Sequence, residues 1–219
     1  MSAFKRIHIA HHRLADEIYR QILDAISSGK IAPQERIVQE RLANEMQVSR
    51  TPVREALLRL EQEGVLALSG RSGFVIRSIS QDEVREIYQV RQAIEGYCAR
   101  LLCERCDPDC YAQLHTLIAE EENLRDHSAK SYFHANRNIH RGIVMLANNR
   151  YMLELFDGVW NRGSSFRIFS AIEDIDLSKS LGEHDSLIDA IASGNPDHAA
   201  AAMRAHIVDG LELQLKHLS

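Results

Sequence analysis

Residues 49–60 read Ser-Arg-Thr-Pro-Val-Arg-Glu-Ala-Leu-Leu-Arg-Leu, and this stretch decides how the N-terminal part of the chain folds. A helix is predicted here, because serine or threonine can cap its start and Pro52 fits a first turn that needs no N–H. Its apolar residues recur at the spacing of a buried stripe: Val53, Ala56, Leu57 and Leu60. Arg50 and Arg54 lie one turn apart on another sector, so the helix should present both arginines outward.

A shorter helix is predicted directly upstream, over residues 38–46. Only two residues separate it from the longer helix, which is the spacing of a helix-turn-helix. The second helix of such a motif enters the major groove of DNA with its N-terminal end first, and arginine there can donate two hydrogen bonds to guanine. Arg50 and Arg54 suit that task, although an ordinary amphipathic helix with solvated arginines has the same spacing.

A β-hairpin is predicted next. The runs 65–68 and 74–77 are apolar, β-branched or aromatic, and Ser-Gly-Arg-Ser-Gly between them has the composition of a turn. Arg71 at the tip would meet the DNA backbone or the minor groove beside the recognition helix. With an amphipathic helix predicted over 11–28, these elements indicate a winged helix-turn-helix domain over residues 1–79.

Five short motifs connect this domain with a known family. They are Leu-Ala-Asp-Glu-Ile-Tyr at 14–19, Ile-Ser-Ser-Gly-Lys-Ile-Ala-Pro at 26–33, Val-Ser-Arg-Thr-Pro-Val-Arg-Glu-Ala-Leu at 48–57, Leu-Glu-Gln-Glu-Gly at 60–64 and Gly-Phe-Val at 73–75. In these motifs the chain resembles the GntR family of bacterial transcription regulators. The resemblance implies that the following residues contact DNA: Ser49, Arg50, Thr51, Arg54, Gly70 and Arg71.

One position departs from the family pattern. Many members carry an arginine ten residues before the one that matches Arg50, and this chain has Glu40 there. A carboxylate cannot donate a hydrogen bond to a phosphate. The phosphate contact of the family is therefore not carried over to this position.

Residues 80–219 are predicted to form an all-α effector-binding and dimerisation domain. Ser80 and Glu83 make a capping box for a long helix that runs to about residue 106. Further helices are expected over 108–126, 130–147, 149–171, 177–193 and 195–218. The predicted fold is therefore mainly α, with a winged helix-turn-helix followed by a bundle of six or seven helices.

Charge is unevenly distributed along the chain. The net formal charge is −5, but residues 1–79 hold 12 Lys and Arg against 9 Asp and Glu, while residues 80–219 hold 14 against 22. DNA binding should therefore rest on placed arginines rather than on bulk charge.

Neither a signal peptide nor an apolar run of about 18 residues, the length of a membrane span, is recognised, so a cytoplasmic protein is expected. In a reducing cytosol the cysteines are expected to serve as small buried hydrophobes rather than as a metal site: Cys98, Cys103, Cys106 and Cys110.

Three histidines lie on the apolar stripes of three different predicted helices: His140, His184 and His206. Asn136 lies one turn before His140 and shares its helix face. Each histidine alone is more typical of a hydrogen-bonded core residue. Together, three imidazoles and an amide that point inward favour a divalent transition metal such as Zn, Ni, Co or Mn.

The second half also carries family motifs. They are Val-Arg-Gln-Ala-Ile-Glu at 90–95, Asn136 with Ile139 and His140, Glu-His-Asp-Ser-Leu-Ile-Asp-Ala-Ile at 183–191, and Ala-Ala-Ala-Met-Arg-Ala-His at 200–206. These residues resemble the FCD ligand-binding domain of the FadR-type branch of the GntR family. The resemblance implies that an aspartate and three histidines bind a metal, with Asn136 at the aspartate position. An amide oxygen carries no charge, so a softer ion that prefers imidazole is expected.

A small carboxylate metabolite is the expected effector, because a metal with these four ligands keeps open positions. Arg91 would form a bidentate pair with the other end of the metabolite. Its alternative role is an ion pair with Glu95, one turn on. Arg162 or Arg167 would also reach this pocket.

The leading interpretation is a homodimeric transcription regulator, and a repressor rather than an activator, that binds an inverted-repeat operator in double-stranded DNA and is no enzyme. One alternative is a regulator for which the metal itself is the signal, without an organic ligand. Another is a helical-bundle metalloenzyme, for which the sequence lacks an evident general base, because Glu183 precedes His184 and should point elsewhere.

Overall fold

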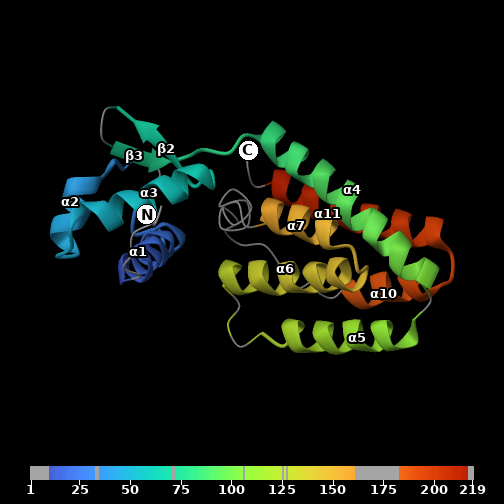
Figure 1. Cartoon of the computed structure of the whole chain (residues 1–219). Helices are drawn as coiled ribbons and strands as arrows, with labels where there is room; N and C mark the ends of the chain where they lie inside the picture. Colours follow the sequence, from blue (N-terminus) through green and yellow to red (C-terminus); the bar gives the residue numbers. More distant parts are fainter. Residues whose placement is uncertain are drawn as a thin grey trace, which may run out of the picture. The chain divides into compact units, whose positions relative to one another are not determined.

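The structure is a computed structural model that describes residues 10–32, 35–70, 73–105, 107–124, 126, 128–160 and 183–216. The chain divides into two compact units, Met1–Ser78 and Ile79–Ser219. The first combines helices with a small sheet, and the described part of the second is helical (Figure 1). The predicted fold class is confirmed.

The first unit has three helices and three strands among its described residues. They are α1 (Ala10–Ser27), β1 (Ile37–Val38), α2 (Gln39–Glu45), α3 (Arg50–Gln62), β2 (Leu66–Ser69) and β3 (Gly73–Ile76). The sheet is antiparallel with the order β1-β3-β2. The strand β1 was not predicted, because Val38 was assigned to the short upstream helix. It pairs Ile37 with Phe74 at the edge of the hairpin.

The predicted stripe of α3 forms the centre of this unit. Val53, Ala56, Leu57 and Leu60 are all buried and pack in one cluster with residues of α1 and of the sheet. The helix begins at Arg50 after Ser49, which has an extended backbone but makes no side-chain capping hydrogen bond. The start of the helix was therefore predicted correctly, and the capping bond was not.

The turn between α2 and α3 requires an unusual backbone conformation. Gln47 has a φ of 53°, in the left-handed region that glycine adopts without a steric penalty. The backbone N–H of Val48 donates to the carbonyl oxygen of Ala43 at 3.0 Å, which closes the turn. This turn holds the two helices in the helix-turn-helix arrangement.

The second unit is a bundle of helices. They are α4 (Gln81–Arg105), α5 (Pro108–Glu122), α6 (Ala129–Leu146), α7 (Arg150–Trp160), α10 (His184–Ala192) and α11 (Pro196–Leu215). The long α4 and α11 lie side by side (Figure 1). At the start of α4 the N–H of Glu83 donates to Ser80 Oγ at 3.1 Å, as half of the predicted capping box requires. The predicted helices 149–171 and 177–193 extend into residues 161–182, outside the described residues.

One large apolar cluster fills the bundle, with contributions from all six of these helices. Cys98, Cys103 and Cys110 are buried, in line with their predicted role as small hydrophobes. Cys106 lies outside the described residues. Each helix therefore turns one apolar stripe inward, and polar residues on these stripes are brought close together.

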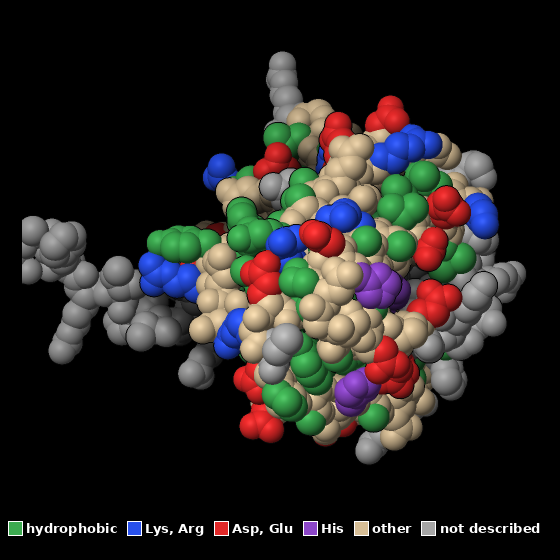
Figure 2. Space-filling view, turned by 90° about the vertical axis from the view of Figure 1, so that its right-hand side faces the viewer, with side chains coloured by type: hydrophobic (Ala, Val, Ile, Leu, Met, Phe, Trp, Pro, Cys, Tyr) green, Lys and Arg blue, Asp and Glu red, His purple; other side chains and the backbone are tan. Residues whose placement is uncertain are grey.

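The surface is mixed in character. On the face shown in Figure 2, acidic side chains are scattered among basic and hydrophobic ones instead of forming one acidic patch. Within the described ranges, no helix is long and apolar enough to cross a membrane.

The core of the first unit gives a matched test of these packing arguments. Leu57→Ala should lower the free energy of unfolding by about 2–5 kcal/mol, because Leu57 has no exposed surface. The same change at Leu68, which is 63% exposed, should cost about 0.5 kcal/mol or less. Urea unfolding followed by circular dichroism compares the two variants. Equal losses would contradict the assignment of α3 as the central helix.

Candidate functional site

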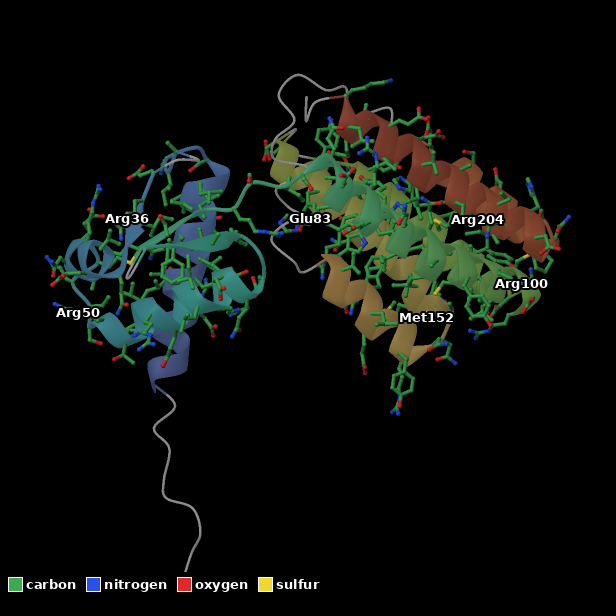
Figure 3. All side chains as sticks on the ribbon, turned by 90° about the horizontal axis from the view of Figure 1, so that it is seen from above. Arg36, Arg50, Glu83, Arg100, Met152 and Arg204 are labelled. Atoms are coloured by element: carbon green, nitrogen blue, oxygen red, sulfur yellow. The ribbon has the colours of Figure 1, made fainter. Side chains whose placement is uncertain are left out.

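The first candidate surface is the N-terminal end of α3. Ser49, Arg50, Thr51 and Arg54 are all exposed there. The side chain of Arg50, labelled in Figure 3, forms an ion pair with Glu40 of α2. The Nε2 atom of Gln39 donates to the backbone oxygen of Arg50 at 3.0 Å. This end of the helix thus presents arginines to solvent and is fastened to the neighbouring helix.

The wing adds a cation that the sequence did not single out. Arg36, just before β1, is exposed and lies against the glycines of the hairpin. A Cβ on Gly73 would lie 2.2 Å from Arg36 Nε, and one on Gly70 would lie 3.2 Å from Arg36 Nη2. Two glycines beside a turn were the available signal for such a close approach. Arg71 at the predicted tip lies outside the described residues.

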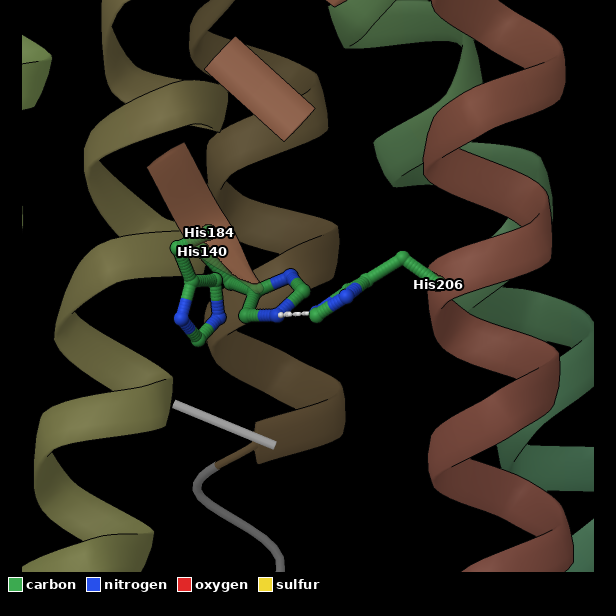
Figure 4. Close-up of side chains that lie close together, drawn as sticks. All are labelled: His140, His184 and His206. Carbon is green, nitrogen blue, oxygen red and sulfur yellow. Dashed lines mark hydrogen bonds between the residues drawn. The ribbon is translucent and has the colours of Figure 1, made fainter. Parts of the chain in front are cut away.

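The second candidate site lies inside the bundle. His140 of α6, His184 of α10 and His206 of α11 come together, and one potential ligand atom from each lies within 4.8 Å of the others (Figure 4). The Nε2 atoms of His140 and His206 are 3.2 Å apart. The sequence pattern thus placed three histidines on stripes that do meet in space.

Two of these imidazoles are held by carboxylates. Nδ1 of His140 lies 2.5 Å from Glu95 Oε2, and Nδ1 of His184 lies 3.3 Å from Glu122 Oε1. An Nδ1–H that donates to a carboxylate leaves a lone pair on Nε2, and this tautomer is the usual one for a metal ligand. Burial and the neighbouring His140 and His184 lower the pKa of His206 to about 2, so the imidazole of His206 is uncharged at neutral pH.

Asn136 is a further candidate donor. It lies one turn before His140 on α6, is only 7% exposed, and its Oδ1 atom is buried without a hydrogen-bond partner among the described residues. A buried acceptor left unsatisfied costs about 1–3 kcal/mol. An amide oxygen on the same helix face as an imidazole is also a possible metal ligand.

Arg91 and Glu95 form a buried pair next to the histidines. Arg91 Nε donates to Glu95 Oε1 at 2.9 Å, and both side chains are almost fully buried. The guanidinium also lies over the rings of Tyr88 and Trp160, at 4.8 and 4.3 Å from their centroids. The ion pair with Glu95, the alternative role of Arg91, therefore exists, and it lies in the interior. Arg162 and Arg167 lie outside the described residues.

Glu95 is the functional residue that sequence reasoning missed. It has no exposed surface and accepts hydrogen bonds from Arg91, His140 and Trp160 Nε1, the last at 3.5 Å. Burial acts to raise its pKa, but Arg91 and His140 outweigh burial and lower it to about 2. Glu95 is therefore a carboxylate at neutral pH, and it links the arginine to the histidine cluster.

Comparisons with known proteins find a matching family for each of the two units. Residues 14–76 match the family model of bacterial regulatory proteins of the gntR family, and residues 86–209 match the FCD domain. The Nta operon transcriptional regulator of Aminobacter aminovorans is 30% identical over 175 residues, which cover 80% of this chain and 82% of that protein.

Two further relatives span nearly the whole chain. The HTH-type transcriptional regulator YdhC of Bacillus subtilis is 28% identical over 204 residues, covering 92% of this chain and 91% of YdhC. The structure of E. coli McbR/YncC has a similar fold, with a TM-score of 0.68, 20% identity, and coverage of 94% of this chain and 99% of that one. The chain belongs to the GntR family of transcription regulators, with an FCD domain after its DNA-binding domain, and it is a DNA-binding regulator rather than an enzyme.

Proposed function

We propose that this regulator is a homodimeric cytoplasmic repressor whose winged units bind an inverted-repeat operator. The bundle holds a divalent transition metal and, on it, a small carboxylate metabolite that releases the DNA. The observation that carries the metal part is the cluster of three imidazoles, together with a buried, unsatisfied amide oxygen on Asn136, one helical turn from His140.

The DNA-binding half of the proposal rests on the exposed end of α3. Arg50 and Arg54 are one turn apart and exposed, so both can reach base edges when the N-terminal end of the helix enters the major groove. Arg36 at the root of the wing presents a cation to the DNA backbone. One helix with few base contacts gives weak specificity, and two copies that read a palindrome multiply it.

Base contacts and backbone contacts can be separated by measurement. Arg50→Ala or Arg54→Ala should weaken operator binding by about 1–3 kcal/mol per half-site and reduce discrimination against scrambled DNA. Arg36→Ala should weaken binding to both DNAs alike. Arg20→Ala, an exposed arginine of α1 paired with Glu17, is the control and should leave the discrimination ratio unchanged. Band-shift titrations with operator and scrambled duplexes measure the two affinities. If the ratio of operator to scrambled affinity were unchanged in Arg50→Ala, Arg50 would have no role in base readout.

One pair of donors in the bundle is spaced as two ligands of one transition metal would be. Two nitrogen ligands about 2.1 Å from one ion lie about 3.0–3.4 Å apart in octahedral or tetrahedral geometry. The observed separation of the two Nε2 atoms, 3.2 Å, is within this range. His140, His184, His206 and Asn136 would hold the ion, and Glu95 and Glu122 would orient two of the imidazoles. When bound, the ion would supply Lewis-acid positions for a carboxylate.

Metal content tests this assignment directly. His184→Ala should abolish metal binding, whereas Asn136→Asp should tighten it, because a charged oxygen replaces a neutral one. His198→Ala, which removes an exposed histidine of α11, should bind metal as the unaltered protein does. Elemental analysis after loading with Zn²⁺ or Ni²⁺ and dialysis gives the occupancy. Full occupancy in His184→Ala would place the metal outside this cluster.

Arg91 connects the cluster to the expected effector. Its Nε donates to Glu95, and its guanidinium lies over the rings of Tyr88 and Trp160. A carboxylate on the metal would find a fixed cation nearby. The ion pair between Arg91 and Glu95 equally supports the alternative in which the metal alone is the signal. Glu95 already balances the charge of Arg91, so Arg91 does not require an organic anion.

The two possibilities differ in the response to carboxylates. Arg91→Lys keeps the positive charge beside Glu95 but loses the planar fork, so it should retain metal and lose the effect of carboxylates on DNA binding. Arg91→Ala is unsuitable, since it would leave a buried carboxylate without its cation. Calorimetric titration of the metal-loaded protein with small dicarboxylates, with and without operator, gives the coupling free energy between carboxylate binding and DNA binding. By reciprocity operator DNA must weaken carboxylate binding as much as carboxylate weakens DNA binding. Equal affinities would leave the metal as the only signal.

A further inference from the structure

We infer that Glu40, which stands where many members of the family carry an arginine, determines DNA specificity by positioning Arg50. This inference rests on the proposed role of Arg50 in base readout. It assigns a function to a carboxylate that cannot itself contact phosphate.

Both the backbone and the guanidinium of Arg50 are held by residues of α2. Glu40 accepts a hydrogen bond from Arg50 Nη2, and the adjacent Gln39 donates to the backbone oxygen of Arg50 at 3.0 Å. Both partners come from the first turn of α2, which packs against α3. The backbone at the start of the recognition helix and the guanidinium at the end of the side chain are therefore fixed by the same neighbouring turn.

The pairing leaves Arg50 competent to read a base. A guanidinium has five N–H donors, and a contact through one of them leaves four. Reading guanine takes two donors, to O6 and N7. An arginine that is already held by a carboxylate loses less rotamer freedom when it docks, so the correct base is bound at a lower entropic cost.

The charge of Glu40 acts in the same direction. Its side chain is 61% exposed, so it lies in solvent next to the surface that meets the DNA. Binding to non-cognate DNA depends almost entirely on attraction to phosphates, and a negative charge on this surface weakens it. At the cognate site the same charge is offset by its arginine. Glu40 therefore raises the ratio of specific to non-specific affinity in two ways. It prepares Arg50 for the correct base, and it weakens binding to non-cognate DNA.

A matched pair of variants tests the inference. Glu40→Gln removes the charge and weakens the contact with Arg50. Glu45→Gln removes the same charge from the same helix, but Glu45 pairs with Arg41 at 2.8 Å and does not touch Arg50. The probes are a duplex enriched from a randomised pool by the unaltered full-length protein, and a scrambled duplex of equal length and composition.

We expect Glu40→Gln to bind the scrambled duplex more tightly and to lower the discrimination ratio by about two- to five-fold per half-site, the range of an exposed ion pair. Glu45→Gln should change both affinities equally and keep the ratio. If Glu40→Gln also changes both affinities equally, Glu40 merely repels DNA and the inference is overturned.

The Arg50→Ala background separates this inference from the proposed function. If Arg50→Ala leaves the ratio unchanged, the proposed base readout by Arg50 fails first, and the role of Glu40 fails with it. If Arg50→Ala lowers the ratio while Glu40→Gln does not, only the role of Glu40 fails. In the double variant, Glu40→Gln should have no further effect on the ratio. A further fall would show that Glu40 acts by a route other than Arg50.

Discussion

A carboxylate without any exposed surface must be held by donors, and in this bundle Glu95 is held from three helices. Arg91 is on α4 itself, His140 on α6 and Trp160 on α7. Removing one partner of such a buried charge typically costs about 3–5 kcal/mol, because the remaining charge is left uncompensated. This constraint ties α6 and α7 to α4 at the level of Glu95. It also fixes which nitrogen of His140 faces the other imidazoles.

The histidine cluster was predictable from sequence, whereas Glu95 was not. Each histidine interrupts an apolar stripe, and a polar residue on a buried stripe is a visible exception in a helical pattern. Glu95, by contrast, follows Arg91 by four residues, which is the ordinary spacing of an exposed helical ion pair. The pair is buried, and becomes the centre of a polar network, because other helices of the bundle pack on α4.

In the DNA-binding unit, too, some features could be predicted from the sequence and others could not. The stripe of α3 and the hairpin followed from periodicity and turn composition, since both are local properties of the chain. The strand β1 has two residues, too few for any periodic signal. Glu40 and Arg50 are ten residues apart on either side of a turn, so their contact depends on the crossing of two helices. Arg36 reaches the glycines of the wing only because β1 pairs with β3.

Asn136 also affects the net charge of the proposed metal site. The amide contributes no charge, and the charges of Glu95 and Arg91 cancel each other. Asn136 would therefore leave the charge of a divalent ion to be balanced by other groups, and uncompensated charge in the interior is costly. An aspartate would remove half of that charge, and asparagine removes none. Metal and a dianionic metabolite would then each supply the charge that the other lacks, so the bundle would respond to the two together far more strongly than to either alone.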